Sequence, residues 1–113
     1  MSGRSNAVYR VTVEVAPEAE PAWLKWMDGE HIPAVLRVGK FLGVTRWKDR
    51  QRTADGWPRY VMHYRAENVA VIEAYQRSPE TTGLRDDYTA RFGKTTRIER
   101  SVLAEPTFIG PRS

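Results

Sequence analysis

The sequence predicts an α+β domain in which four strands and the helices between them follow the order β-α-β-β-α-β. Two patterns carry this prediction: short segments with alternating apolar and polar residues, and longer segments where apolar residues recur at helical spacing. The third observation is length, because 113 residues allow only one domain. We therefore expect residues 1–113 to form a single domain, with residues 1–7 and 106–113 as flexible or partner-wrapping tails.

The first half of the chain predicts a strand, a helix and a second strand. Residues 9–15 alternate apolar and polar side chains, which gives this strand two different faces. Pro17 suits the first turn of a helix, where its missing N–H costs nothing, and helical spacing continues to Val38. Gly39 is the expected C-terminal cap. Residues 41–48 then predict the second strand.

The second half predicts a strand, two helices and a last strand. Residues 57–66 form the third expected strand, and Asn68 caps a short helix over 69–77. A longer helix over 79–92 begins with a proline and is followed by a glycine. The last strand covers 95–103. This order is the split βαβ pattern of ferredoxin-like folds, with an antiparallel four-stranded sheet and the helices on one face.

The other face of such a sheet stays open and needs a cover. Apolar and charged side chains are expected together on this face: Val61, Leu42, Val44, Arg10, His63 and Arg97. A second sheet packed across a two-fold axis removes the exposure. The sequence therefore predicts a homodimer.

Charge and composition exclude several classes of protein. The net charge is +4, but the basic residues are scattered rather than gathered with aromatic side chains on one face, so we expect no nucleic-acid partner. No apolar run is long enough for a membrane span or a signal peptide. Cysteine is absent, which fits a cytoplasmic protein. Two histidines without a carboxylate at ligand spacing predict no metal site.

One histidine stands out within residues 23–36. His31 is flanked on its helix face by Leu24, Met27 and Val35, so it is directed toward the sheet, where an imidazole is a usable acid or base. The alternative is a core or capping histidine. Pro33 cannot donate a hydrogen bond to the helix, so a kink or restart is expected near it, and His31 lies at that break.

The same stretch resembles the dimeric α+β barrel superfamily. The resemblance rests on Trp23-x-x-Trp26-Met27-x-x-Glu30-His31-Ile32-Pro33, Gly39-x-Phe41-Leu42, Arg46-Trp47, Tyr60-Val61-Met62-His63-Tyr64 and Leu84-Arg85-x-x-Tyr88-x-x-Arg91-Phe92-Gly93. Within the superfamily the chain is most similar to the uncharacterised DUF4286 family. The superfamily includes polyketide cyclases, muconolactone-type isomerases, EthD-like proteins, cofactor-free monooxygenases and haem-degrading enzymes. The resemblance implies a homodimer with a small-molecule pocket between helices and sheet, without naming a substrate.

Aromatic and sulfur-containing side chains are expected to line that pocket. The candidate substrate-binding residues are Tyr9, Trp23, Met27, Tyr60, Met62, Tyr88 and Arg91. Each aromatic residue alone is equally well explained as core, but their number in a small domain favours a ligand site. Arg91 either holds a carboxylate or phenolate, or is a solvated charge at a helix end.

Three functions remain open. The leading hypothesis is an enzyme without cofactor that moves a proton on an aromatic or polyketide-like substrate, as a cyclase or isomerase does. His31 and Tyr64 are its candidate catalytic residues, as base or acid and as stabiliser of an enolate. The alternatives are a non-catalytic dimeric module that binds a metabolite or protein, and a cofactor-independent monooxygenase.

Overall fold

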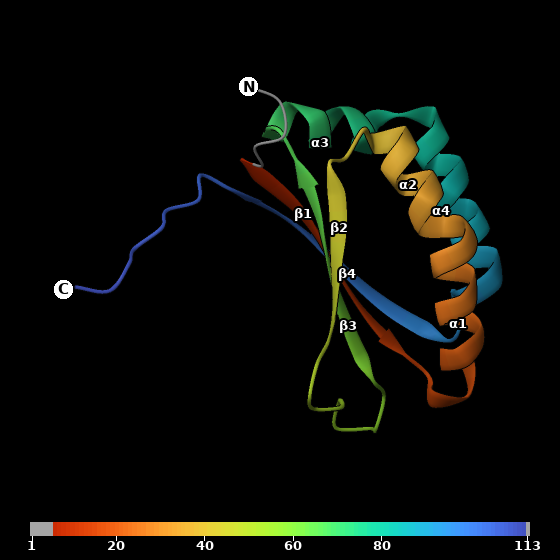
Figure 1. Ribbon diagram of the computed structural model, residues 1–113. Helices are drawn as coiled ribbons and strands as arrows, with labels where there is room; N and C mark the ends of the chain where they lie inside the picture. Colours follow the sequence, from red (N-terminus) through yellow and green to blue (C-terminus); the bar gives the residue numbers. More distant parts are fainter. Residues whose placement is uncertain (1–5, 113) are drawn as a thin grey trace.

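The computed structural model describes residues 6–112 and shows a ferredoxin-like α+β fold. One antiparallel sheet has the strand order β2-β3-β1-β4, and the helices cover one of its faces (Figure 1). The strands are β1 (Ala7–Val15), β2 (Gly43–Lys48), β3 (Arg59–Ala66) and β4 (Thr96–Ala104). The predicted fold class, with an antiparallel four-stranded sheet and helices on one face, is therefore confirmed.

The helical layer consists of a long interrupted segment followed by two regular helices. Its elements are η1 (Pro17–Ala19), α1 (Glu20–Trp26), η2 (Met27–His31), α2 (Ile32–Gly39), α3 (Val69–Arg77) and α4 (Pro79–Phe92). Asn68 caps α3 by accepting a hydrogen bond from the Val71 amide, and Ser78 caps α4 through the Glu80 amide. These two helices match the predicted segments.

The interruption of the first helical segment lies where proline predicts it. The element η2 is a π-turn, in which the Ile32 amide donates to the carbonyl of Met27, five residues earlier. Pro33 follows in the first turn of α2 and has no N–H to leave unpaired. The chain thus passes from α1 to α2 without a sharp break, and the widened turn carries His31.

The expected cap at Gly39 is wrong by one residue. Gly39 is the last helical residue, and Lys40 takes the left-handed conformation, with φ of 52°. A side chain at position 39 would collide with the Phe41 ring, which packs back against the helix end. Glycine is needed here for this close approach, and β2 begins later than predicted, at Gly43.

Alternation divides the strands between a buried and an open face. Tyr9 pairs with Tyr64 in the β1–β3 register, and both side chains are buried toward the helices, while His63 lies on the open face. Val44 of β2 stands opposite Tyr64 and packs against the core, so its predicted place on the open face is wrong. Trp47, also on β2, lies on the opposite face from Val44, opposite Val61 of β3. Its side chain is 59% exposed on this open face.

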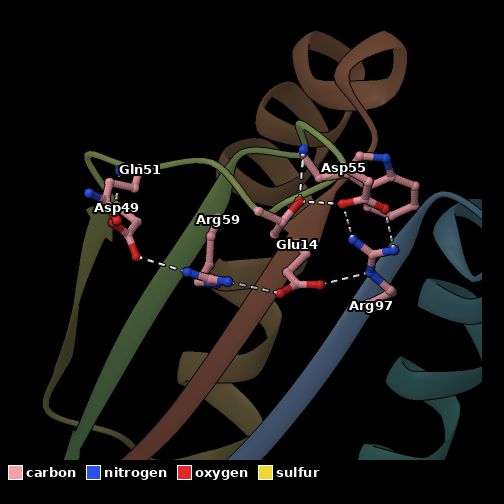
Figure 2. A network of polar contacts seen from close by, with 8 residues as sticks. Glu14, Asp49, Gln51, Asp55, Arg59 and Arg97 are labelled. Atoms are coloured by element: carbon pink, nitrogen blue, oxygen red, sulfur yellow. Dashed lines mark hydrogen bonds and ion pairs between the residues drawn. The ribbon is translucent and has the colours of Figure 1, made fainter.

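Ion pairs join three strands and the 49–58 loop at one end of the open face (Figure 2). Glu14 lies at the centre and accepts hydrogen bonds from Arg59 at 3.2 Å and from Arg97 at 2.7 Å. Arg97 also holds Asp55 with both terminal nitrogens, and Arg59 reaches Asp49. The network fixes the loop against the sheet and neutralises charges on the face that we expect a partner to cover.

The ends of the chain differ from each other. Ala7 begins β1 instead of lying in the expected N-terminal tail, and residues 1–5 lie outside the described residues. At the other end, residues 106–112 form no helix or strand and leave the sheet on the side opposite the helices (Figure 1). Phe108 and Ile109 in this segment are 91% and 86% exposed. In the described part of the chain, no helix has the length and apolar character needed to cross a membrane.

Candidate functional site

A cavity lies between the helical layer and the buried face of the sheet. Six of the nine predicted site residues line it: Tyr9, Met27, His31, Met62, Tyr64 and Tyr88. They come from β1, the π-turn, β3 and α4, so the fold brings together residues that are far apart in sequence. Trp23, Tyr60 and Arg91 are not part of the lining.

His31 enters the cavity from the π-turn and is held between two aromatic rings. Its imidazole stacks on Trp26, with centroids 4.9 Å apart and planes inclined by 23°, and lies 5.4 Å from the Tyr88 ring. The pKa of His31 is lowered to about 4, mainly by burial, with an opposing effect of Asp87 and a smaller lowering effect of Arg100. The imidazole is therefore neutral at pH 7, and burial makes it a weaker base than a free imidazole.

Tyr64 lies deeper, on β3, and keeps its proton. Its ring is 5.4 Å from Phe41 and 6.2 Å from Tyr9, and its hydroxyl is directed at the Met62 sulfur, 4.0 Å away. Burial raises the pKa of Tyr64 well above that of a free tyrosine, and the neighbouring Tyr75 and Tyr9 raise it further. Tyr64 is thus a hydrogen-bond donor rather than a base.

Two of the predicted residues outside the lining are held by structural contacts on the helical side. Trp23 is fully buried behind Tyr88, and its indole nitrogen donates to the Tyr88 hydroxyl over 2.9 Å. Arg91 pairs with Asp87 at 3.2 Å, and its guanidinium lies 5.1 Å from the Trp26 ring centroid. Arg91 is thus committed to contacts outside the cavity.

Tyr60, the third of them, points toward the start of α1. Its hydroxyl donates to Glu20 over 2.6 Å, and the ammonium of Lys48 lies 5.6 Å from its ring centroid. Desolvation and the adjacent carboxylate of Glu20 raise the pKa of Tyr60. This polar cluster is separate from the cavity.

Sequence reasoning missed three of the polar lining residues, namely Tyr75, Arg85 and Arg100. Arg85 lies on α4 one turn before Tyr88, and its Nη2 donates to the Tyr9 hydroxyl over 3.1 Å. Arg100 lies on the helix-facing side of β4, opposite Val11. Helical spacing from Tyr88 and strand alternation from Ile98 were the available signals for these two residues. The remaining lining is aliphatic: Val11, Val13, Val35 and Ile98.

The free volume of the cavity is about 40 Å³. This holds water, whose share of liquid volume is about 30 Å³, but is far below the ~300 Å³ of a typical ligand pocket. An aromatic ligand therefore enters only when lining side chains move. Arg85 is half-exposed and Arg100 exposed, so these long side chains can swing outward without opening the packed core.

Metal ligands are not gathered at the cavity. Within residues 6–112, no group of three or more histidine, cysteine, aspartate or glutamate side chains is placed to hold a metal ion. The ionisable groups of the lining are one imidazole, two guanidinium groups and four phenols. This set can accept a proton, donate hydrogen bonds and attract negative charge.

Comparisons with known proteins give the same fold and one family. The sequence profile of a domain of unknown function, DUF4286, matches residues 6–105. No curated protein matches the sequence. Among solved structures, an EthD family protein from Bacillus halodurans is similar, with 13% identity, coverage of 88% of this chain and 99% of that one, and a TM-score of 0.64.

Two oxygenase structures share the fold over nearly the whole chain. A monooxygenase from the gene ActVA-Orf6 of Streptomyces coelicolor, in complex with nanaomycin D, has 15% identity and a TM-score of 0.63, with 96% of this chain and 94% of that one covered. SnoaB, a cofactor-independent oxygenase from Streptomyces nogalater, has 13% identity and a TM-score of 0.59, with 95% and 100% covered. At these identities the likeness concerns the fold.

Proposed function

The chain belongs to the DUF4286 family, and we propose that its cavity binds a small aromatic molecule and removes a proton from it. The observation that carries this proposal is the neutral imidazole of His31 in an aromatic cavity. A general base must be unprotonated and must reach the proton that it takes. His31 meets the first condition at pH 7, and its place in the lining supports the second.

The remaining lining supports the anion that such a step produces. Removal of a proton from a carbon next to a carbonyl places negative charge on the carbonyl oxygen. Tyr64 is a phenol that keeps its proton, and Arg85 has N–H groups beyond the one used by Tyr9. In a cyclase or isomerase, the proton on His31 then returns to another atom of the substrate, and no oxidant is consumed.

Oxygenation is the second candidate, and the structural neighbours favour it. Two of them are described as a monooxygenase and a cofactor-independent oxygenase. The same carbanion reacts with dioxygen when the substrate can delocalise an electron: an aromatic CH₂ group and O₂ give C=O and H₂O. Proton removal by His31 is the first step of both reactions. The consumption of dioxygen therefore distinguishes them.

Proton transfer is tested with two carbon acids, 2-tetralone and anthrone, in D₂O. Loss of the CH₂ proton signals above the protein-free rate reports proton removal, and an oxygen electrode reports O₂ uptake. His31→Gln should reduce both to background, whereas His63→Gln, on the open face, should not. Exchange without O₂ uptake supports the isomerase or cyclase, and uptake with water as product supports the oxygenase. Background rates for the unaltered protein would leave a non-catalytic module that binds a metabolite or protein. Equal rates above background for the protein and for His31→Gln would exclude His31 as the base.

We also propose that the open sheet face is covered by a second copy of the chain. Trp47 and Leu103 are 59% and 42% exposed on this face, and the tail with Phe108 leaves on the same side (Figure 1). Light scattering should give a dimer that Val61→Asp, at the centre of the face, converts to monomer. Lys25→Gln, the same charge change on the helical side, should leave it dimeric; a monomer for the unaltered protein would contradict the proposal.

The predicted cytoplasmic location stays a prediction.

A further inference from the structure

We propose that the cavity selects an aromatic carboxylic acid, whose carboxylate is bound by Arg85 and Arg100. This inference rests on the proposed small-molecule function and adds the substrate class. It starts from the charge of the lining. Both arginines line the cavity, and none of its lining residues is an aspartate or glutamate.

The two arginines have no acidic partner among the described residues, unlike the arginines that form the ion pairs of the fold. Within residues 6–112, neither Arg85 nor Arg100 forms an ion pair. Four described arginines outside the cavity do so: Arg46 with Asp28, Arg59 with Glu14 and Asp49, Arg91 with Asp87, and Arg97 with Glu14 and Asp55. The other described arginines without an ion pair do not line the cavity. Two guanidinium groups beside one apolar cavity, both without a counter-charge, make that cavity a site of positive potential.

The two side chains reach the cavity from opposite layers. Arg85 comes from α4 and Arg100 from β4, while Tyr9 and Val11 of β1 lie beneath them. The hydrogen bond from Arg85 to the Tyr9 hydroxyl, 3.1 Å long, orients that guanidinium along the cavity. It uses one N–H of five, so Arg85 keeps donors for a ligand, and Arg100 donates no hydrogen bond to another described residue. A carboxylate between the layers can therefore be bound from both sides.

The chemistry of the walls defines the rest of the ligand. A planar guanidinium matches the two oxygens of a carboxylate, and such charge-assisted hydrogen bonds are stronger than neutral ones. His31, Tyr88 and Tyr75 present aromatic surfaces, which suit a flat apolar body. One anionic group on an aromatic ring meets both requirements. Since the arginines reach solvent, their side chains can shift outward to make room for the ring and still contact the carboxylate.

The test compares an acid with its neutral amide of nearly equal shape. Binding of 1-naphthoate and 1-naphthamide is measured by calorimetry, and the imidazole resonances of His31 report whether the ligand is in the cavity. We expect 1-naphthoate to bind at least about tenfold more tightly. Arg85→Gln and Arg100→Gln should each remove most of this preference. Arg77→Gln, which removes the same charge from the exposed side of α3, should retain it.

Further variants separate recognition of charge from damage to the fold. Arg85→Lys and Arg100→Lys keep the charge, so they should preserve the preference for acid over amide if both variants melt like the unaltered protein. Arg100→Glu, on an edge strand, should reverse the preference in favour of 1-naphthylmethylamine, which is cationic. Equal affinity for acid and amide, with His31 signals shifted by both, would overturn the anionic class and leave the proposed pocket intact. If neither probe shifts His31, both proposals fail.

Discussion

The indole nitrogen of Trp23 donates a hydrogen bond to the hydroxyl of Tyr88 over 2.9 Å, which ties α1 to α4. The Tyr88 hydroxyl in turn donates a hydrogen bond to the Thr96 hydroxyl at 3.0 Å, and Thr96 donates to the carbonyl of Phe92 at 2.7 Å. This buried chain satisfies every hydroxyl along it. Tyr88 therefore offers its ring to His31 while its hydroxyl is engaged elsewhere, so it is a wall of the cavity rather than an acid.

Removing the Tyr88 hydroxyl should destabilise the fold. In Tyr88→Phe the buried Trp23 N–H loses its acceptor, and an unpaired buried donor costs about 1–3 kcal/mol. Urea denaturation measures this as a lower free energy of unfolding. Tyr75→Phe is the matched control, because the Tyr75 hydroxyl makes no hydrogen bond within residues 6–112, and its loss should change stability little. Equal losses for both variants would contradict this assignment.

Two glycines of the first helical segment should respond oppositely to alanine. A Cβ at Gly39 collides with the Phe41 ring, which cannot move aside because Tyr64 and Tyr75 rings lie 5.4 and 5.2 Å from it. Gly39→Ala should therefore lower the free energy of unfolding by about 1–3 kcal/mol. A Cβ at Gly29, in the π-turn, meets no atom within 4 Å. Gly29→Ala should raise stability by about 0.5–1 kcal/mol, as helical alanine does; a loss there would mean that the turn needs glycine's backbone freedom.

Strand faces were predictable from the sequence where strands are long and central. Alternation in β1 and β3 places Tyr9 and Tyr64 toward the helices and His63 away from them, whatever the error at the strand ends. The faces of the short strand β2 were not predictable in this way. Its register depends on the conformation of the chain after Lys40 and on the 49–58 loop. The sequence prediction for Val44 is therefore wrong, because Val44 packs against the core.

The charged residues of the site are only partly predictable from the sequence, for a different reason. Arg85 and Arg91 both lie three residues from Tyr88 on α4, so spacing alone does not distinguish them. What separates them is which end of α4 the cavity meets, and that follows from packing. Helical side chains lean toward the N-terminus, which directs Arg85 to Tyr9 and Arg91 to Trp26 and Asp87.

Arg97 should control the ionisation of Asp55 in the open-face network. Its guanidinium holds the pKa of Asp55 at about 2, below the ordinary 3.8, with a hydrogen bond from Thr53 as the second cause. A ¹³C carboxyl titration of Arg97→Gln should therefore show the Asp55 pKa moving toward 3.8. Arg59→Gln is the control, because Arg59 pairs with Glu14 and Asp49 and not with Asp55. An Asp55 pKa that stays near 2 without Arg97 would assign the shift to Thr53.

His31 should make the fold less stable as the pH falls. Its pKa is about 4 when folded and 6.5 in the ordinary, solvated state, so between these values the unfolded chain binds a proton that the native state does not. The free energy of unfolding therefore falls as pH drops from about 7 toward 4, by on the order of 2 kcal/mol after allowance for partial exposure. Above pH 7 both states are neutral, and this effect vanishes.

Carboxylates titrate in both the unaltered protein and His31→Gln. The difference between the two in the free energy of unfolding therefore isolates the contribution of His31. Urea denaturation at about pH 7 and about pH 5 should show a smaller loss of stability for His31→Gln. Parallel losses would mean that His31 titrates in the native state as it does in water, and so that burial does not lower its pKa. A ligand carboxylate beside Arg100 would favour the imidazolium, so saturation with 1-naphthoate should raise the His31 pKa, whereas 1-naphthamide should not.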